Sequence, residues 1–349
     1  MISTNWDFQD NIHPVQDIEN SIFLLLAFGF SNSEGIKKIK KQWKALNGKV
    51  GRGRTETGKV SSEELGGVVS AIQVDMSTGD IYNLKHIDIT CPMGLLIHGN
   101  ELFIASEYYI QAFAGGEKTY RINNPFFNGL HAMKKSQVGN SFYVTCTNID
   151  TLVEICLDGK GIKWRWSAPE YGYNTNKLGE KVFIDENRLY QYDETFSSTL
   201  THTTHVNCIE EYSPDEILAT LFHQGEVILI NKNTRKITSI LKGLTCPHGI
   251  HRFGDQFIVS DTKGNCTYLL DRNLKVLEKI GHQDFDWIQD SIILKDGNIV
   301  ILNSNGGGIH LYDKNKRDFT HKVNFDPDKR RVSCAIELSR DEVEKIILE

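Results

Sequence analysis

Residues 247–251, Pro-His-Gly-Ile-His, open the stretch that decides the fold, because three more apolar runs follow it at short intervals. These runs are 255–261 (DQFIVSD), 266–271 (CTYLLD) and 276–280 (VLEKI), and polar residues separate them. Short runs rich in Val, Ile and aromatic residues between polar turns are typical of β-strands. The stretch therefore predicts a meander of four antiparallel strands.

The same unit recurs along the chain. Its first strands are aligned here on Met93, His131, His205, His248, Asp290 and Cys334. The spacings are 38, 74, 43, 42 and 44 residues, against roughly 40 to 50 residues for one blade of a β-propeller. The pattern predicts an all-β, six-bladed β-propeller with a long inter-blade insertion at 167–204. A propeller of seven blades is the alternative, with the seventh blade hidden in that insertion.

The two ends of the sequence complete one blade. The runs at 21–28, 68–75 and 81–84 supply middle and outer strands, and residues 332–338 near the C-terminus supply the missing inner strand. Closing the ring in this way protects sheet edges that would otherwise pair with other chains. We therefore expect a single propeller domain over residues 1–349, with a basic loop inserted at 37–66.

Composition limits the choice of compartment and partner. The chain carries a net charge of −6, which argues against general affinity for nucleic acid or anionic membranes. The apolar run at 22–30 is too short to span a bilayer, and the seven cysteines include no Cys-x-x-Cys pair. These features predict a cytoplasmic protein with free thiols and no membrane or nucleic-acid partner.

The basic insertion has one motif-like segment. Residues 53–60 (GRTETGKV) imitate a phosphate-binding P-loop, but Val60 stands where that motif needs a hydroxyl for Mg²⁺. We interpret the match as chance. The basic residues between Lys37 and Lys59 are interpreted as a solvated loop, with contact to a phosphate-bearing partner as the alternative.

Three histidines occupy the start of the inner strands. Equivalent positions of successive blades point at one axis, so His131, His205 and His248 are predicted to converge. Three neutral imidazoles with an open coordination position suit Zn, Fe, Mn, Ni or Cu as a divalent ion. Asp290 takes the corresponding place in the next blade. The alternative is that the histidines are polar side chains hydrogen-bonded to backbone or water in a wet channel.

Polar residues near the ends of the second strands are predicted to face the same mouth of the channel. We expect them to hydrogen-bond the imidazoles or the substrate; they are Glu107, Asn148, His223, Asp261 and Asn305. Arg252 and Arg331 are candidate anchors for a substrate carboxylate. His251 lies an odd number of residues after His248, so strand alternation predicts that it points away from the axis and packs between blades.

Two short motifs carry a family resemblance. With 246–250 (CPHGI) and 91–95 (CPMGL) as inner-strand starts, nearly the whole chain resembles the six-bladed propellers of the NHL-like repeat and SMP-30/gluconolactonase types. One His from each of three blades is similar to the peptidyl-α-hydroxyglycine α-amidating lyases, whose propeller holds a catalytic zinc in that way. This resemblance implies His131, His205 and His248 as the ligands. The catalytic Arg and Tyr of that family have no match here, and SMP-30-like lactonases use carboxylate and Asn ligands instead.

The function predicted from these features is that of a metal-dependent lyase, hydrolase or isomerase acting on a small polar substrate. Asp290, or else Glu107 or Asp261, would serve as acid or base. The first alternative is a non-catalytic propeller that binds a protein or glycan partner through its rim and loops. The second is a propeller resembling the arylsulfotransferases, in which a channel histidine transfers a group without metal.

Overall fold

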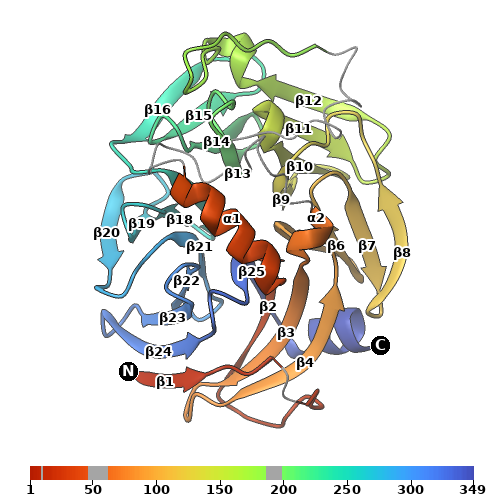
Figure 1. The fold of residues 1–349 in the computed structure, drawn as a ribbon, viewed down its shortest axis with the longest axis vertical. Helices are drawn as coiled ribbons and strands as arrows, with labels where there is room; N and C mark the ends of the chain where they lie inside the picture. The colour runs from red at the N-terminus through yellow and green to blue at the C-terminus, as the bar shows by residue number, and fades with distance from the viewer. Residues whose placement is uncertain (9–10, 46–61, 186–198) are drawn as a thin grey trace.

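Six small antiparallel sheets stand in a ring around a central axis (Figure 1), so the prediction of a six-bladed β-propeller is confirmed. The computed structural model describes residues 1–8, 11–45, 62–185 and 199–349. We number the blades in the order in which their inner strands occur. In each blade the inner strand lies nearest the axis and successive strands lie farther out.

The strands of the blades have the following bounds. Blade 1 contains β5 (Gly94–His98), β6 (Glu101–Ala105), β7 (Ile110–Ala114) and β8 (Glu117–Ile122). Blade 2 contains β9 (Leu130–Lys135), β10 (Ser141–Cys146), β11 (Thr151–Cys156) and β12 (Ile162–Ser167). Blade 3 contains β13 (Val206–Ser213), β14 (Glu216–Leu221), β15 (Glu226–Asn231) and β16 (Ile237–Lys242). Blade 4 contains β17 (Pro247–Phe253), β18 (Gln256–Asp261), β19 (Cys266–Leu270) and β20 (Val276–Gly281). Blade 5 contains β21 (Ile288–Ile293), β22 (Ile299–Asn303), β23 (Gly308–Asp313) and β24 (Asp318–Asn324), with β1 (Ile2–Asn5) parallel to β24.

Blade 6 closes the ring as the sequence predicts. Its inner strand is β25 (Arg331–Leu338), followed outward by β2 (Ser21–Phe30), β3 (Val68–Asp75) and β4 (Ile81–Asp88). Leu26 pairs with Ala335 in the antiparallel register of β2 and β25. A short helical segment, α3 (Arg340–Glu342) and η4 (Val343–Leu348), follows β25 and packs Val343 and Ile347 against the core between blades 6 and 1.

Side-chain alternation explains how adjacent blades pack. In β2, Leu24, Leu26 and Phe28 contact the core shared with blade 5, while Leu25 and Ala27 contact the core shared with blade 1. A strand that is buried on both faces reads as a continuous apolar run, which is why 22–28 has no polar residue. Full burial of each leucine contributes about 1.5–3 kcal/mol, so the ring is held by the contacts between blades.

The basic insertion in blade 6 is helical where it is described, so the expectation of a loop at 37–66 is wrong for those parts. Asn32 directly precedes helix α1 (Ser33–Ala45), and its side chain accepts hydrogen bonds from the backbone N–H groups of Glu34 and Gly35. Helix α2 is Ser62–Leu65. Ile36 and Ile39 lie on one face of α1 and are buried, because positions three apart share a helix face. Figure 1 shows α1 crossing the centre of the ring. The P-loop-like residues 53–60 lie outside the described residues.

The second insertion leaves blade 2 after β12 and returns at β13. Its described part contains the short helix η2 (Ala168–Tyr171) and a bridge between Thr175 and Lys181, and it adds no seventh sheet among the described residues. Within the parts of the chain that the structure places, no helix is long and apolar enough to cross a membrane. All seven cysteines are thiols.

Candidate active site

A repeated backbone feature sets the inner face of the ring. In five blades a residue with positive φ stands just before the inner strand; these are Cys91, Gly129, His205, Cys246 and Trp287. The residue two positions later lines the axis. The resulting ring, which we call the axial ring, consists of Met93, His131, Asn207, His248 and Gln289, with Ser333 from blade 6.

The axial ring corrects the alignment used for the sequence. His131 and His248 occupy it as predicted, but His205 lies two residues ahead of its member Asn207. Asp290 and Cys334 each lie one residue after theirs. The sequence was aligned on residue type, whereas the backbone sets the equivalent positions: the register shifts at Val206–Ile209 and Pro247–Ile250 flank Asn207 and His248 alike.

Two cavities meet at the axial ring. One, of about 180 Å³, is lined by Ile39 of α1, Phe30 and His205, and we call it the α1-side chamber. The other, of about 260 Å³, lies toward the opposite face of the propeller, and we call it the far chamber. Met93, His131, His248, Gln289 and Ser333 line both. The two imidazoles are therefore accessible from either chamber.

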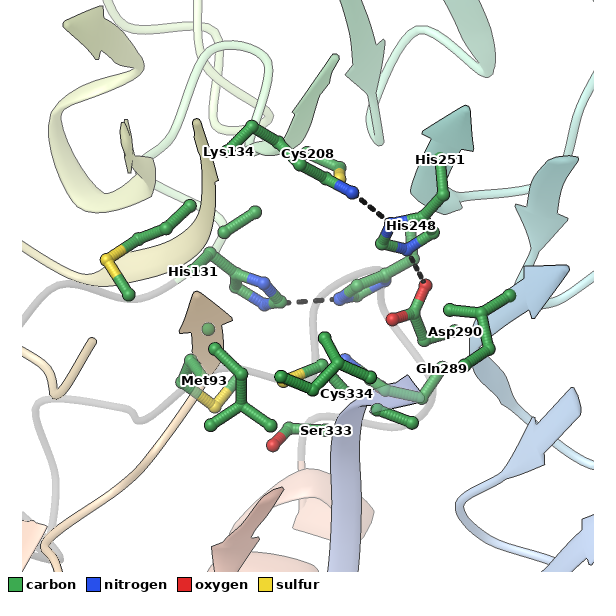
Figure 2. Close-up of a pocket in the computed structure, with 18 of the residues that line it drawn as sticks. Met93, His131, Lys134, Cys208, His248, His251, Gln289, Asp290, Ser333 and Cys334 are labelled. Atoms are coloured by element: carbon green, nitrogen blue, oxygen red, sulfur yellow. Dashed lines mark hydrogen bonds and ion pairs between the residues drawn. The ribbon is translucent and has the colours of Figure 1, made fainter. Parts of the chain in front are cut away.

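His131 and His248 face each other across the axis (Figure 2). Their Nε2 atoms are 3.2 Å apart and their ring centroids 4.8 Å apart. The amide Nδ2 of Asn207 donates to Nδ1 of His248 at 3.3 Å, which places the proton of His248 on Nε2, directed at Nε2 of His131. Burial lowers the pKa of His131 to about 4 and that of His248 well below its ordinary value. Both rings are therefore neutral.

His205 joins this pair less closely. Its ring centroid is 6.4 Å from that of His131, and its Nδ1 lies 2.6 Å from Nδ1 of His202. Burial, followed by the neighbouring His202, lowers the pKa of His205 well below the usual range. Within the described residues, no group of three or more His, Cys, Asp or Glu is arranged so that it could hold a metal ion.

A metal ion fits the His131 and His248 pair better than it fits the set of three. Two ring nitrogens that bind one tetrahedral ion at about 2.1 Å lie about 3.4 Å apart, close to the observed 3.2 Å. In the same arrangement one nitrogen of His205 already faces His202. Of the three predicted ligands, His131 and His248 are therefore the two whose spacing suits a metal ion.

The far chamber contains a chain of polar contacts (Figure 2). Nζ of Lys134 donates to Nδ1 of His251 at 2.5 Å, and Nε2–H of His251 donates to Oδ1 of Asp290 at 2.5 Å. Lys134 also pairs with Glu210 at 3.1 Å. The pKa of Lys134 is raised, because Glu210 and its other neighbours outweigh the opposing effect of burial.

The position predicted for His251 is wrong. It lines the far chamber rather than packing between blades, because the bulge in β17 changes which residues share a face. Lys134 lies three residues after His131 and reaches the same chamber. Lys134 and His251 each lie three residues after a histidine of the axial ring. This shared spacing is the signal in the sequence that could have placed both side chains in one chamber.

Four of the other predicted site residues line a chamber, while His223 and Asn305 line neither. Glu107, Asn148 and Arg331 line the α1-side chamber, and Arg252 lines the far chamber. His223 contacts His205 at 5.8 Å between ring centroids, and Asn305 accepts a hydrogen bond from Arg331. Burial lowers the pKa of His223 to about 4.

Asp261 does not reach the axis, so its predicted role as acid or base has no support in the geometry. Its Oδ1 accepts from the backbone N–H of Thr245 at 2.7 Å, and its carboxylate packs against Gly264. Asp261 lines neither chamber. The last residue of β18 stabilises a turn instead.

Sequence reasoning missed the residue that positions His205. The buried carboxylate of Asp150 accepts five hydrogen bonds from the segment before β13: from N–H and Oγ1 of Thr203, from N–H and Oγ1 of Thr204, and from N–H of His205. Asp150 thus fixes the end of the second insertion against blade 2. The sequence gives no pattern for a contact between residues so far apart.

Comparisons with known proteins identify the fold class only. No protein-family model and no curated protein matches the chain. A protein of unknown function from Bacteroides caccae is similar in structure, with a TM-score of 0.57, 12% identity, and coverage of 91% of this chain and 99% of that chain. A chain of a nidogen/laminin complex has a TM-score of 0.56 at 9% identity, covering 91% and 98%.

An enzyme-like neighbour is a candidate 6-phosphogluconolactonase from Bacteroides fragilis NCTC 9343, with a TM-score of 0.54, 11% identity, and coverage of 93% of this chain and 100% of that chain. At these identities the likeness shows a β-propeller and nothing finer. The same fold serves enzymes and binding proteins, so function has to be argued from the site.

Proposed function

We propose that the chain is an enzyme that acts on a small polar substrate in the axial channel, as a lyase, hydrolase or isomerase. The observation that carries the proposal is the neutral His131 and His248 pair, which both chambers share. Each chamber adds a buried carboxylate: Glu107 on the α1 side and Asp290 on the far side. Neutral imidazoles that share a chamber with a buried carboxylate are suited to proton transfer.

The proposed cofactor is a divalent metal ion. His131 and His248 would hold it, and His205 would approach from the α1-side chamber. When bound, such an ion polarises a carbonyl or hydroxyl or lowers the pKa of water. Metal binding at Nε2 would require the proton of His248 on Nδ1, where Oδ1 of Asn207 would accept it after rotation of the amide and so orient the ring.

The chain's own residues have separate tasks in this proposal. Glu107 and Asp290 are the two carboxylates available to take or give a proton. Arg331 and Asn148 would orient the polar groups of a substrate in the α1-side chamber. On that side Ile39 of α1 lines the chamber and adds an apolar wall. The likeness in fold to a candidate lactonase is compatible with this proposal and adds no substrate to it.

Elemental analysis of protein purified without chelator tests the cofactor. We expect about one divalent ion per chain, and more than tenfold weaker binding after His131→Ala or His248→Ala. His13→Ala, which changes a histidine of the N-terminal segment outside both chambers, is the matched control. Protein without stoichiometric metal, combined with unchanged ligand binding after joint replacement of His131, His205 and His248, would contradict the metal-dependent enzyme and favour a non-catalytic propeller.

A further inference from the structure

Asp290 presents half of its carboxylate to the far chamber. Oδ1 accepts from Nε2–H of His251 at 2.5 Å and from the backbone N–H of Ser291 at 2.9 Å. No described residue contacts Oδ2 with a hydrogen bond or an ion pair, although the side chain is only 5% exposed. Figure 2 shows this second oxygen directed toward the axis.

The lysine that acts on Asp290, Lys134, is shared with a second carboxylate and makes no direct contact with Oδ2 among the described residues. Lys134 is paired with Glu210 at 3.1 Å, and it attracts Asp290 electrostatically from beyond His251, whose Nδ1 accepts its hydrogen bond. The other two cations of the chamber have separate partners. Arg252 donates to the carbonyl oxygens of Gly254 and Tyr212, and Lys295 lies 3.5 Å from Glu342.

A buried carboxylate is costly unless both oxygens are satisfied, so an oxygen that faces a pocket without a hydrogen bond from the described residues favours a ligand that supplies positive charge and N–H donors. The walls around it are largely apolar, with Leu95, Met133, Ile292 and Ile336 lining the chamber. Its volume of about 260 Å³ lies below the roughly 300–1,000 Å³ of pockets for drug-sized ligands. The charge of the carboxylate, the apolar walls and the small volume of the far chamber together favour a small organic cation as its ligand.

We propose that the far chamber binds the protonated amine of a small organic substrate, with Oδ2 of Asp290 accepting an N–H bond from the ammonium group. This inference rests on the proposed function in one respect, namely that the bound amine is the substrate of the channel. Lys134 and His251 are positioning residues that fix the carboxylate through Oδ1. Glu107 is then the carboxylate left for proton transfer.

Binding of two isosteric probes tests this inference. Ethanolamine, which is protonated at neutral pH, and ethylene glycol, which is neutral, are titrated into the chelator-treated full chain and followed by NMR. We expect ethanolamine to bind at least tenfold more tightly than ethylene glycol. Asp290→Asn keeps the shape of the side chain and removes its charge, so it should abolish the preference. Glu107→Gln, the matched change in the other chamber, should retain it.

A second variant covers the case in which Asp290→Asn fails to fold. A methyl group at Gly249 would overlap Oδ1 of Asp290, so Gly249→Ala should displace the carboxylate and reduce the preference for ethanolamine without changing any charge.

Equal binding of the two probes to the wild type, or a preference that survives Asp290→Asn, would overturn the inference. Mg²⁺ or Zn²⁺ alone competing fully with ethanolamine would also overturn it, by assigning the oxygen to a metal. The readout needs neither turnover nor bound metal, so its failure is distinguishable from failure of the proposed function.

Discussion

Replacement of Asp150 by alanine is expected to lower the free energy of unfolding by roughly 3–5 kcal/mol. The change removes the acceptor of five hydrogen bonds, and three of the donors are backbone N–H groups. Donors left unpaired in a buried setting cost about 1–3 kcal/mol each before relaxation. Asp150 also has a φ of 50°, a conformation that aspartate tolerates better than alanine.

Urea unfolding followed by tryptophan fluorescence measures this effect. The matched control is Asp158→Ala, in the exposed turn between β11 and β12, where the carboxylate accepts one backbone hydrogen bond, from Lys160 at 3.0 Å. We expect the control to change stability by less than about 1 kcal/mol. If the two variants unfolded at the same urea concentration, Asp150 would not be the residue that fastens the second insertion.

The number of blades could be predicted because each blade repeats the same physical requirement. The second strand of each blade is buried over most of its length and the connections between strands carry polar residues, so apolar runs and polar gaps recur at the blade spacing. Closure by β25 followed from the same logic, since the runs at 21–28 and 68–75 lacked an inner strand. The helix α1 was missed because the lysines around Ile36 and Ile39 resemble a charged loop when composition alone is considered.

The site was harder to predict than the fold because its register depends on bulges. Strand alternation is a rule of period two, and one extra residue reverses it for the rest of the strand. His131 and His248 were placed correctly on the axial ring, since they stand at the same point relative to the register shifts of β9 and β17. His205 was not, because Asn207 holds the equivalent position. His251 and Lys134 were missed because each lies after a bulge, which changes the face on which a residue of the inner strand lies.

Acid sensitivity is the second large effect, and His310 is its clearest source. The residue is fully buried in blade 5, and no described residue hydrogen-bonds to either ring nitrogen. Burial lowers the pKa of His310 to about 4 from an ordinary value of 6.5. Between these two pH values the unfolded chain binds a proton that the folded chain does not, so the free energy of unfolding falls as the pH falls. For a shift of this size the loss is about 3 kcal/mol by pH 4, and His131 and His223 add losses of the same sign.

Two variants separate titration from packing, with stability measured by urea unfolding from pH 7 to pH 4. His310→Leu should flatten the pH dependence by about 3 kcal/mol over this range. It should also maintain or raise stability at pH 7, because a leucine leaves no polar atom unpaired among Phe285 and Phe319. His310→Gln should flatten the dependence equally but lower stability at pH 7, since it buries an amide in the same place. If both variants kept the wild-type slope, the acid sensitivity would have to arise from the other buried histidines, such as His131 and His223.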